Sequence, residues 1–131
     1  MTDTSLPQAP ADILIVEDDA TMRELLSLHL DMAGYRVRVA EDAVEAGKML
    51  LTGVPPDLLL LDMRMPFLGG DEFLELLRGN ERLRNLKVIA LTSIRDDSFI
   101  MKITALGVSD VIHKPVHKEL LLESVRKVLK K

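Results

Sequence analysis

Four short apolar runs of the sequence end in polar side chains that could take part in chemistry. One run is followed by three consecutive acids, the second by a single acid, the third by two hydroxyls and the fourth by a lysine. The side chains concerned are Glu17-Asp18-Asp19, Asp62, Thr92-Ser93 and Lys114. If the four runs are parallel, neighbouring strands, their carboxyl ends meet at one edge of a sheet. The sequence therefore predicts a cluster of carboxylates faced by a hydroxyl and an amine.

Such a cluster of carboxylates needs a cation. Acids that are brought together repel one another, and the crowding raises their pKa values unless a positive charge intervenes. Mg²⁺ suits this place because it binds a few carboxylates together with water and phosphate oxygens. Taken alone, residues 17–19 could instead be a solvated turn that holds one helix cap. Their combination with Asp62, Thr92 and Lys114 at three other strand ends favours the metal site.

The strand before Asp62 is the clearest element in the sequence. Four leucines at 58–61 follow Pro55-Pro56 and end at a charge, which is typical of a fully buried strand. Strands of parallel sheets have this composition because helices cover both faces of the sheet. Asp62 is therefore expected at the carboxyl end of a central strand, where open α/β folds place their chemistry.

Apolar strands alternate with amphipathic helices along the chain. The expected strands are 13–16, 35–39, 58–61, 88–91 and 108–112, and the expected helices are 21–33, 42–52, 70–78, 95–106 and 116–130. Five such units imply parallel strands with helices on both faces, and they are too few for an eight-stranded barrel. The expected fold class is α/β: an open, doubly wound, five-stranded parallel sheet, (βα)5.

Length and composition limit the number of domains, the location and the kinds of site that the chain can have. The chain has 131 residues, 47% of them hydrophobic and 29% charged, which indicates one globular domain. Residues 1–11 are polar and contain proline, and we expect a flexible tail there before a domain over residues 12–131. The lack of cysteine excludes disulfides and thiolate metal sites. No apolar stretch reaches membrane-spanning length, so a cytoplasmic protein is expected, and a net charge of −4 argues against direct nucleic-acid binding.

The sequence resembles the receiver domains of two-component response regulators, and chemotaxis-regulator-like receivers in particular, from about residue 12 to residue 130. The resemblance rests on four motifs, each at an expected strand end. They are Ile15-Val16-Glu17-Asp18-Asp19, Asp62-Met63-Arg64-Met65-Pro66, Leu91-Thr92-Ser93 and Lys114-Pro115. It implies the flavodoxin-like form of this fold, with strand order 2-1-3-4-5. It also implies a signalling module of a phosphorelay, which is a phosphoacceptor and not an enzyme beyond its own phosphotransfer and slow autodephosphorylation.

The resemblance also implies the phosphoacceptor and the metal ligands. Asp62 would accept a phosphoryl group from a phosphohistidine on a sensor histidine kinase or phosphotransfer protein. Asp18 and Asp62 would ligate Mg²⁺ directly, and Glu17 would act through water. The backbone carbonyl of Arg64 would be a further ligand.

Two more residues would act on the phosphoryl group by the same resemblance. Thr92 would hydrogen-bond its oxygens and Lys114 would neutralise them, which is the general logic of phosphoryl transfer. A cis peptide bond between Lys114 and Pro115 is also implied. The implied partners are the kinase and an output protein or C-terminal effector domain, with a homodimer through the last strand and the last two helices as one further option.

One position departs from the family pattern. Typical receivers have an aromatic residue three places before the lysine, whereas this chain has Val111. Because valine has no ring to turn inward, we expect loop and helix shifts to carry the switch. The alternative is a receiver-like module that binds its partners constitutively. Ile94, two residues past Thr92, is expected to shield the aspartyl phosphate from water.

Two enzyme classes fit the same architecture less well. A flavin or dinucleotide enzyme would need a glycine- or hydroxyl-rich phosphate loop after the first strand, where residues 17–19 are acids. A metal-dependent phosphatase with an aspartate nucleophile usually has a second acid two residues on, where this chain has Arg64. Residues 69–73 spell the diguanylate cyclase signature GGDEF, but we expect them to open an amphipathic helix, since five βα units leave no room for a cyclase domain.

Overall fold

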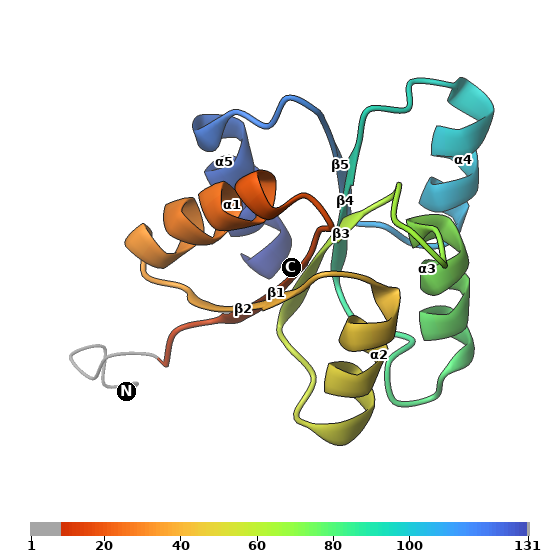
Figure 1. Ribbon diagram of the computed structural model, residues 1–131, viewed down its shortest axis with the longest axis horizontal. Coiled ribbons are helices and arrows are strands. Elements are labelled where there is room, and N and C mark those ends of the chain that lie inside the picture. Colours follow the sequence, from red (N-terminus) through yellow and green to blue (C-terminus); the bar gives the residue numbers. More distant parts are fainter. Residues whose placement is uncertain (1–8, 131) are drawn as a thin grey trace.

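The computed structural model describes residues 9–130, in which strands and helices alternate (Figure 1). The strands are β1 (Asp12–Val16), β2 (Arg36–Ala40), β3 (Leu58–Asp62), β4 (Val88–Thr92) and β5 (Asp110–His113). The helices are α1 (Ala20–Met32), α2 (Ala43–Thr52), α3 (Gly70–Gly79), α4 (Asp97–Ala105) and α5 (Lys118–Lys130). The predicted succession of five βα units is confirmed.

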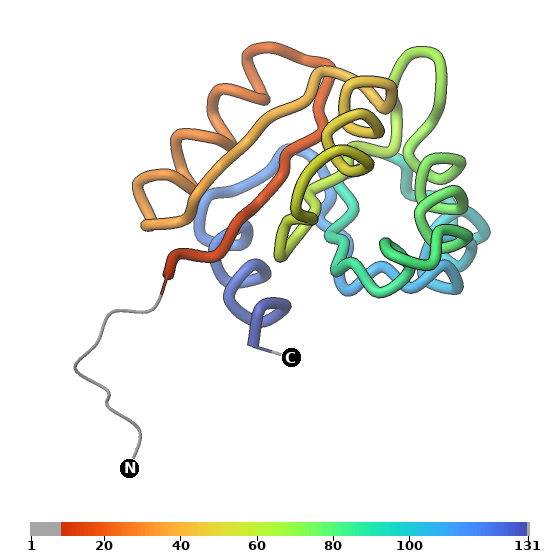
Figure 2. Tube along the Cα trace, turned by 90° about the horizontal axis from the view of Figure 1, so that it is seen from below, coloured from red at the N-terminus to blue at the C-terminus, as the bar shows by residue number. Residues whose placement is uncertain are grey.

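All five strands pair in parallel in one sheet with the order β2-β1-β3-β4-β5, as predicted. The helices form a layer on each face of this sheet, with α1 and α5 on one side and α2, α3 and α4 on the other (Figures 1 and 2). The open, doubly wound, flavodoxin-like α/β fold is therefore confirmed. Since the strands are parallel, their carboxyl ends share one edge of the sheet, called here the carboxyl edge, and the opposite edge is the amino edge.

The central strand β3 is buried along its whole length, as its leucines predict. Leu59 and Leu61 belong to the hydrophobic cluster that α2, α3 and α4 share, whereas Leu58 and Leu60 belong to the cluster under α1 and α5. Alternate residues serve the two layers because successive side chains of a strand point to opposite faces. Burial on both faces fixes the strand and, with it, the position of Asp62 at its end.

Three elements begin two residues later than the pattern predicts, and local hydrogen bonds explain two of these shifts. Helix α4 is delayed because the Asp96 carboxylate accepts a hydrogen bond from the Ser98 amide and makes Asp96 the N-cap. Strand β5 is delayed because the Val108 amide donates to the Ile103 carbonyl and so closes the end of α4. Helix α5 is the third element that begins two residues later than predicted. Periodicity locates the elements, but such capping contacts set their ends.

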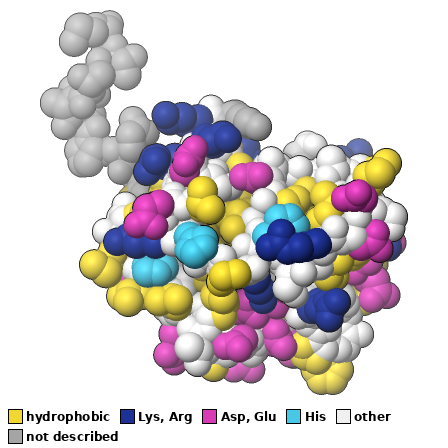
Figure 3. All heavy atoms as spheres, turned by 90° about the horizontal axis from the view of Figure 1, so that it is seen from above, with side chains coloured by type: hydrophobic (Ala, Val, Ile, Leu, Met, Phe, Trp, Pro, Cys, Tyr) yellow, Lys and Arg dark blue, Asp and Glu magenta, His cyan; other side chains and the backbone are white. Residues whose placement is uncertain are grey.

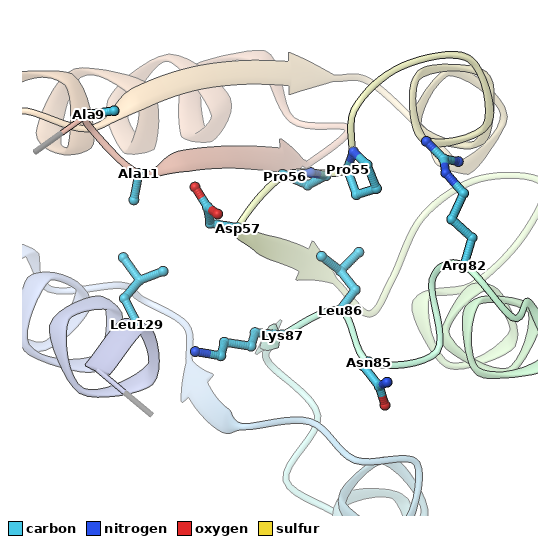
Figure 4. Close-up of a pocket in the computed structure, with 10 residues that line it drawn as sticks. All are labelled: Ala9, Ala11, Pro55, Pro56, Asp57, Arg82, Asn85, Leu86, Lys87 and Leu129. Carbon is cyan, nitrogen blue, oxygen red and sulfur yellow. The ribbon is translucent and has the colours of Figure 1, made fainter.

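Two arginines at the amino edge donate hydrogen bonds to the connections between helices and strands. The guanidinium of Arg78, in the last turn of α3, donates to four main-chain carbonyls of the α3–β4 and α4–β5 connections. These carbonyls belong to Arg84, Leu86, Leu106 and Gly107, at 2.8–3.1 Å. The side chain of Arg82 extends toward the end of α2 and donates to the carbonyls of Leu50 and Gly53 (Figure 4). Three neighbouring connections are thereby joined to α3 and the residues that follow it.

The predicted tail lies mostly outside the described residues. Residues 1–8 and residue 131 are not described, and residues 9–11 form no regular secondary structure before β1 begins. The division of the chain into a flexible tail and a domain over residues 12–131 stays a prediction. Among residues 9–130, none of the helices combines the length and the apolar character that crossing a bilayer requires.

Candidate functional site

The first acids stand directly after β1, at the carboxyl edge. Glu17 is fully buried, with 0% of its surface exposed, and its amide continues the sheet by donating to the Ala40 carbonyl at 3.1 Å. Asp18 is exposed. Asp19 is the N-cap of α1, since its Oδ1 accepts a hydrogen bond from the Met22 amide at 2.9 Å. The three consecutive acids therefore divide into one buried acid, one exposed acid and one helix cap.

Asp62 ends β3 with its side chain almost fully buried, at 2% exposure for the residue. Its Oδ1 accepts a hydrogen bond from the Arg64 amide at 3.1 Å. Gly70 begins α3 directly against this strand end: a Cβ there would collide with the Asp62 carbonyl oxygen and lie 2.7 Å from the Met63 Cα. Glycine is needed where the backbones approach so closely. The GGDEF run thus opens a helix, as predicted, and its second glycine seats that helix on the strand end.

Lys114 brings the last strand into the cluster. Its amide donates to the Thr92 carbonyl at 2.9 Å, which holds the residue beside the end of β4. Its Nζ lies 3.0 Å from Oε1 of Glu17 and 3.3 Å from Oδ2 of Asp62. The peptide bond to Pro115 is cis, as expected. One ammonium group therefore bridges acids that come from two different strands.

These groups change one another's affinity for protons. Burial raises the pKa of Glu17 from its usual 4.5 to about 7, and the neighbouring Asp62 adds to the effect while Lys114 opposes it. Burial also acts to lower the pKa of Lys114, but its hydrogen bond to Glu17 and the charge of Asp62 outweigh burial and leave that pKa raised. Glu17 therefore binds a proton more tightly than a free glutamate does, and Lys114 keeps its proton beside the two acids.

The acids are arranged as a divalent cation would need them. Glu17, Asp18 and Asp62 each offer one carboxylate oxygen, and these oxygens lie within 4.8 Å of one another. A donor set made only of oxygen suits a hard ion such as Mg²⁺. Burial is the main cause of the raised pKa of Glu17, and the nearby Asp62 adds to it. The residues present fit the predicted metal.

Thr92 and Arg64 lie at the same edge of the sheet. Thr92 is buried at the end of β4, one residue past Leu91, which pairs with Asp62. Its Oγ1 accepts a hydrogen bond from the Ile94 amide at 2.9 Å. At Arg64 it is the amide that contacts Asp62, and the role of its carbonyl as a metal ligand stays a prediction.

Sequence reasoning missed a residue that supports the acids. The amphipathic pattern of α1 puts Arg23 on the polar side of the helix, yet its side chain is only 16% exposed. Its Nη1 donates to the carbonyl of Glu17 at 2.8 Å and to that of Asp18 at 3.4 Å. The guanidinium thereby braces the backbone that carries both acids. The one sequence signal for this role is that Arg23 is a basic residue one helical turn after the N-cap Asp19.

The remaining surface offers hollows but no comparable group of acids among the described residues. Viewed onto the carboxyl edge, lysine and arginine side chains lie close to acidic ones (Figure 3). A hollow of about 520 Å³ lies at the amino edge, and its lining includes a single acid, Asp57 (Figure 4). That carboxylate accepts a hydrogen bond from the Asp12 amide at 2.7 Å, which is a structural contact. The carboxyl edge is therefore the candidate site.

Comparison with known families matches residues 13–126 to the response regulator receiver domain. The chain is 34% identical over 119 residues to the DNA-binding dual master transcriptional regulator RpaA of Synechocystis, covering 91% of this chain and 49% of that protein. It is 38% identical over 121 residues to the response regulator MprA of Mycobacterium tuberculosis, covering 91% and 50%. The chain thus spans about half the length of these relatives.

Solved structures of receivers share the fold. The chemotaxis protein CheY4 of Vibrio cholerae superposes with a TM-score of 0.85 at 28% identity, covering 92% of this chain and 99% of that one. The response regulator receiver protein of Pseudomonas putida gives a TM-score of 0.86 at 32% identity, covering 92% and 99%. The family match includes the acids after β1, Asp62, Thr92 and Lys114, since all of them fall within residues 13–126.

Proposed function

This chain belongs to the response regulator receiver domain family, and on that premise we propose that Asp62 accepts a phosphoryl group from a phosphohistidine donor in a Mg²⁺-dependent reaction. One observation carries the proposal. The buried Asp62 carboxylate has an oxygen within 4.8 Å of oxygens from two other acids, and the Lys114 Nζ lies 3.3 Å from its Oδ2. A nucleophile, a place for a cation and a fixed ammonium group therefore stand together at one strand end.

In the proposed step, a carboxylate oxygen of Asp62 attacks the phosphorus atom of the donor. The new P–O bond forms as the P–N bond to the donor imidazole breaks, and the nitrogen leaves with the electron pair and takes up a proton from solvent. The product is an aspartyl phosphate, a mixed anhydride. Phosphoryl transfer of this kind depends mainly on positioning and on positive charge near the transferring oxygens.

The chain supplies both requirements. Lys114 is already held beside Asp62, so a phosphoryl group added there would meet a cation without a rearrangement of β5. Because the Thr92 Oγ1 accepts from the Ile94 amide, the Thr92 hydroxyl hydrogen is left to donate to a phosphoryl oxygen. Glu17, Asp18, Asp62 and the Arg64 carbonyl would hold Mg²⁺, which supplies further positive charge when bound.

Donor and output partners complete the proposed function. We propose a sensor histidine kinase or phosphotransfer protein as the donor, in the cytoplasm. Because the chain spans about half the length of RpaA, which is named as a DNA-binding regulator, a C-terminal effector domain or a separate output protein is proposed to receive the signal. A homodimer through β5, α4 and α5 is a further proposed form of output. The domain itself would act as a phosphoacceptor and not as an enzyme on other substrates.

Val111 favours a second candidate function. This half-buried valine on β5 packs against the cluster beneath α2, α3 and α4, and it has no ring that could turn when Asp62 is modified. A domain of this kind could present one partner-binding surface in both states. Loss of partner binding on removal of the phosphate, or its persistence, distinguishes the two functions.

Incubation with Mg²⁺ and a small acyl phosphate, followed by intact mass spectrometry, tests the proposal. Wild type should gain the mass of one phosphoryl group, and chelation of the metal should prevent this. Asp62→Asn should gain none. The matched control is Asp57→Asn at the amino edge, which should be modified like wild type because asparagine can still accept the Asp12 amide hydrogen bond. An equal adduct on Asp62→Asn, or none on wild type, would overturn the assignment.

A further inference from the structure

Helix α2 contains a glycine that the fold does not need. Gly47 lies inside the helix with an ordinary helical backbone, and a Cβ built there would meet only the Phe73 ring edge, at 4.0 Å. An interior glycine weakens a helix relative to alanine, so its presence calls for a reason. Neither a positive φ nor a close backbone approach supplies one here, in contrast to Gly70. Gly47 therefore leaves space beside the Phe73 ring that a side chain at this position would occupy.

Gly47 opens the floor of an apolar groove between α2 and α3, two helices that lie side by side on the same face of the sheet (Figures 1 and 2). The groove measures about 240 Å³. Its walls are formed chiefly by Leu51 of α2 and by Phe73, Leu76 and Leu77 of α3. Leu51 and Leu76 are each 63% exposed, so apolar surface continues over both rims. The groove is too small for a whole small-molecule ligand but can take one or two large side chains.

The spacing of the lining residues indicates the shape of the occupant. On α2 the groove is lined at positions 47, 50 and 51, which are three and four apart, and on α3 at 73, 76 and 77, followed by the C-cap residue 80. Both helices therefore present one stripe along their length, as in proteins that bind an amphipathic helix in a groove. The gap left by the missing side chain of Gly47 gives a hole into which a large aliphatic residue of such a helix would insert.

The two rims of the groove have opposite charges, basic on α2 and acidic on α3. They complement a helix that has acidic residues along one side of its apolar stripe and basic residues along the other. Lys48 is exposed on α2, three residues before Leu51. Glu72 is exposed on α3, four residues before Leu76, and its Oε1 also accepts a hydrogen bond from the Gly69 amide at 3.3 Å. Residues three or four apart lie next to each other on a helix surface, so each charge borders the apolar stripe. An occupant with an acid beside α2 and a base beside α3 would pair with both.

We propose that the α2–α3 groove is a docking site for an amphipathic partner helix, which inserts an aliphatic side chain over Gly47 and carries an acidic and a basic flank. The site lies away from the carboxyl-edge acids, and the inference does not depend on phosphorylation of Asp62. It gives the domain a protein-binding surface formed by α2 and α3, separate from β5, α4 and α5.

The test uses the full chain and a synthetic helical probe. The probe is a fluorescein-labelled peptide of about 18 residues, long enough to be helical, with leucines spaced three and four apart, glutamate on one flank and lysine on the other. Fluorescence anisotropy should show saturable binding to wild type. Gly47→Leu fills the hole and Leu76→Glu places a charge on the rim, and each should weaken binding at least about tenfold.

Two controls keep the test decisive. Leu28→Glu changes a leucine that is also exposed, but on α1 across the sheet, and it should bind the probe like wild type. The urea midpoint of Gly47→Leu should be no lower than that of wild type, since leucine favours a helix over glycine. No binding to wild type, or equal weakening by Leu28→Glu, would overturn the proposal. Self-association of wild type that Gly47→Leu abolishes, without peptide binding, would instead assign the groove to a second copy of the chain.

Discussion

Replacing Glu17 by glutamine should remove much of the pH dependence of stability that the acid cluster causes in metal-free protein. Glu17 is fully buried, and burial with the neighbouring Asp62 raises its pKa from 4.5 to about 7. The folded state therefore holds this proton more tightly than the unfolded state does. The resulting stabilisation is fully present below pH 4.5 and is lost as the pH rises through 7.

The shift sets an upper limit on the size of the effect. From 4.5 to about 7 is about 2.5 pKa units, and at about 1.36 kcal/mol per unit this amounts to about 3 kcal/mol of unfolding free energy. The ion pair with Lys114 lowers this pKa, and its effect is already contained in the value of about 7. Glutamine cannot ionise, so the Glu17→Gln protein should lack this component altogether.

Urea unfolding in the presence of EDTA, followed by circular dichroism across the pH range, measures the effect. The unfolding free energy of wild type should fall relative to that of Glu17→Gln as the pH rises through the window. Glu24→Gln, which changes an exposed glutamate of α1, is the control and should follow wild type. Added Mg²⁺ should restore stability to wild type at neutral pH, because it binds the ionised acids of the folded state. Parallel curves for wild type and Glu17→Gln would refute the reasoning.

Other substitutions test the supports of the site and the fate of its product. Gly70→Ala should lower the unfolding free energy by about 2–4 kcal/mol because the added methyl lies 2.7 Å from the Cα of Met63. Gly79→Ala is the control and should not destabilise the protein, since nothing lies within 4 Å of the added methyl. Equal urea midpoints for the two variants would contradict this prediction. Arg78→Met should lower the unfolding free energy by about 2–4 kcal/mol because it leaves four carbonyls without their hydrogen-bond donor. An unchanged urea midpoint would show that water replaces the guanidinium as the donor. Ile94→Glu should shorten the lifetime of the aspartyl phosphate severalfold, as followed by loss of the mass adduct; an unchanged lifetime would rule out shielding.

The parts of the site that could be predicted are those that parallel topology determines. Glu17 and Lys114 come from the first and last strands, yet their side chains meet at 3.0 Å because all strands end at one edge. The apolar runs locate each strand, the succession of βα units makes the strands parallel, and the resemblance to receivers implies the strand order that the sheet has. Residue type and strand end together were therefore enough to bring Glu17, Asp62 and Lys114 to one place before any contact was known.

The supports of the site could not be predicted in the same way. Helical periodicity assigns Arg23 to the polar side of α1, but it does not reveal that a long side chain turns back to the carbonyls of the preceding loop. The tight contact at Gly70 depends on where α3 meets β3, which is a tertiary relationship. The starts of α4 and β5 depended on single hydrogen bonds at Asp96 and Val108, which residue patterns do not encode.

The arginines at the amino edge give the two ends of the sheet different freedom to move. Arg78 and Arg82 join three connections there through main-chain hydrogen bonds, so an opening of one connection must break bonds to another. At the carboxyl edge, the loop after β3 instead exposes Phe67, whose φ of 71° is unfavourable for a residue with a side chain. Amide hydrogen exchange should accordingly be slowest along the strands and at the amino edge, and fastest in the loop after β3. A domain held in this way can rearrange the loops that surround its acids while the opposite end of every strand stays in place.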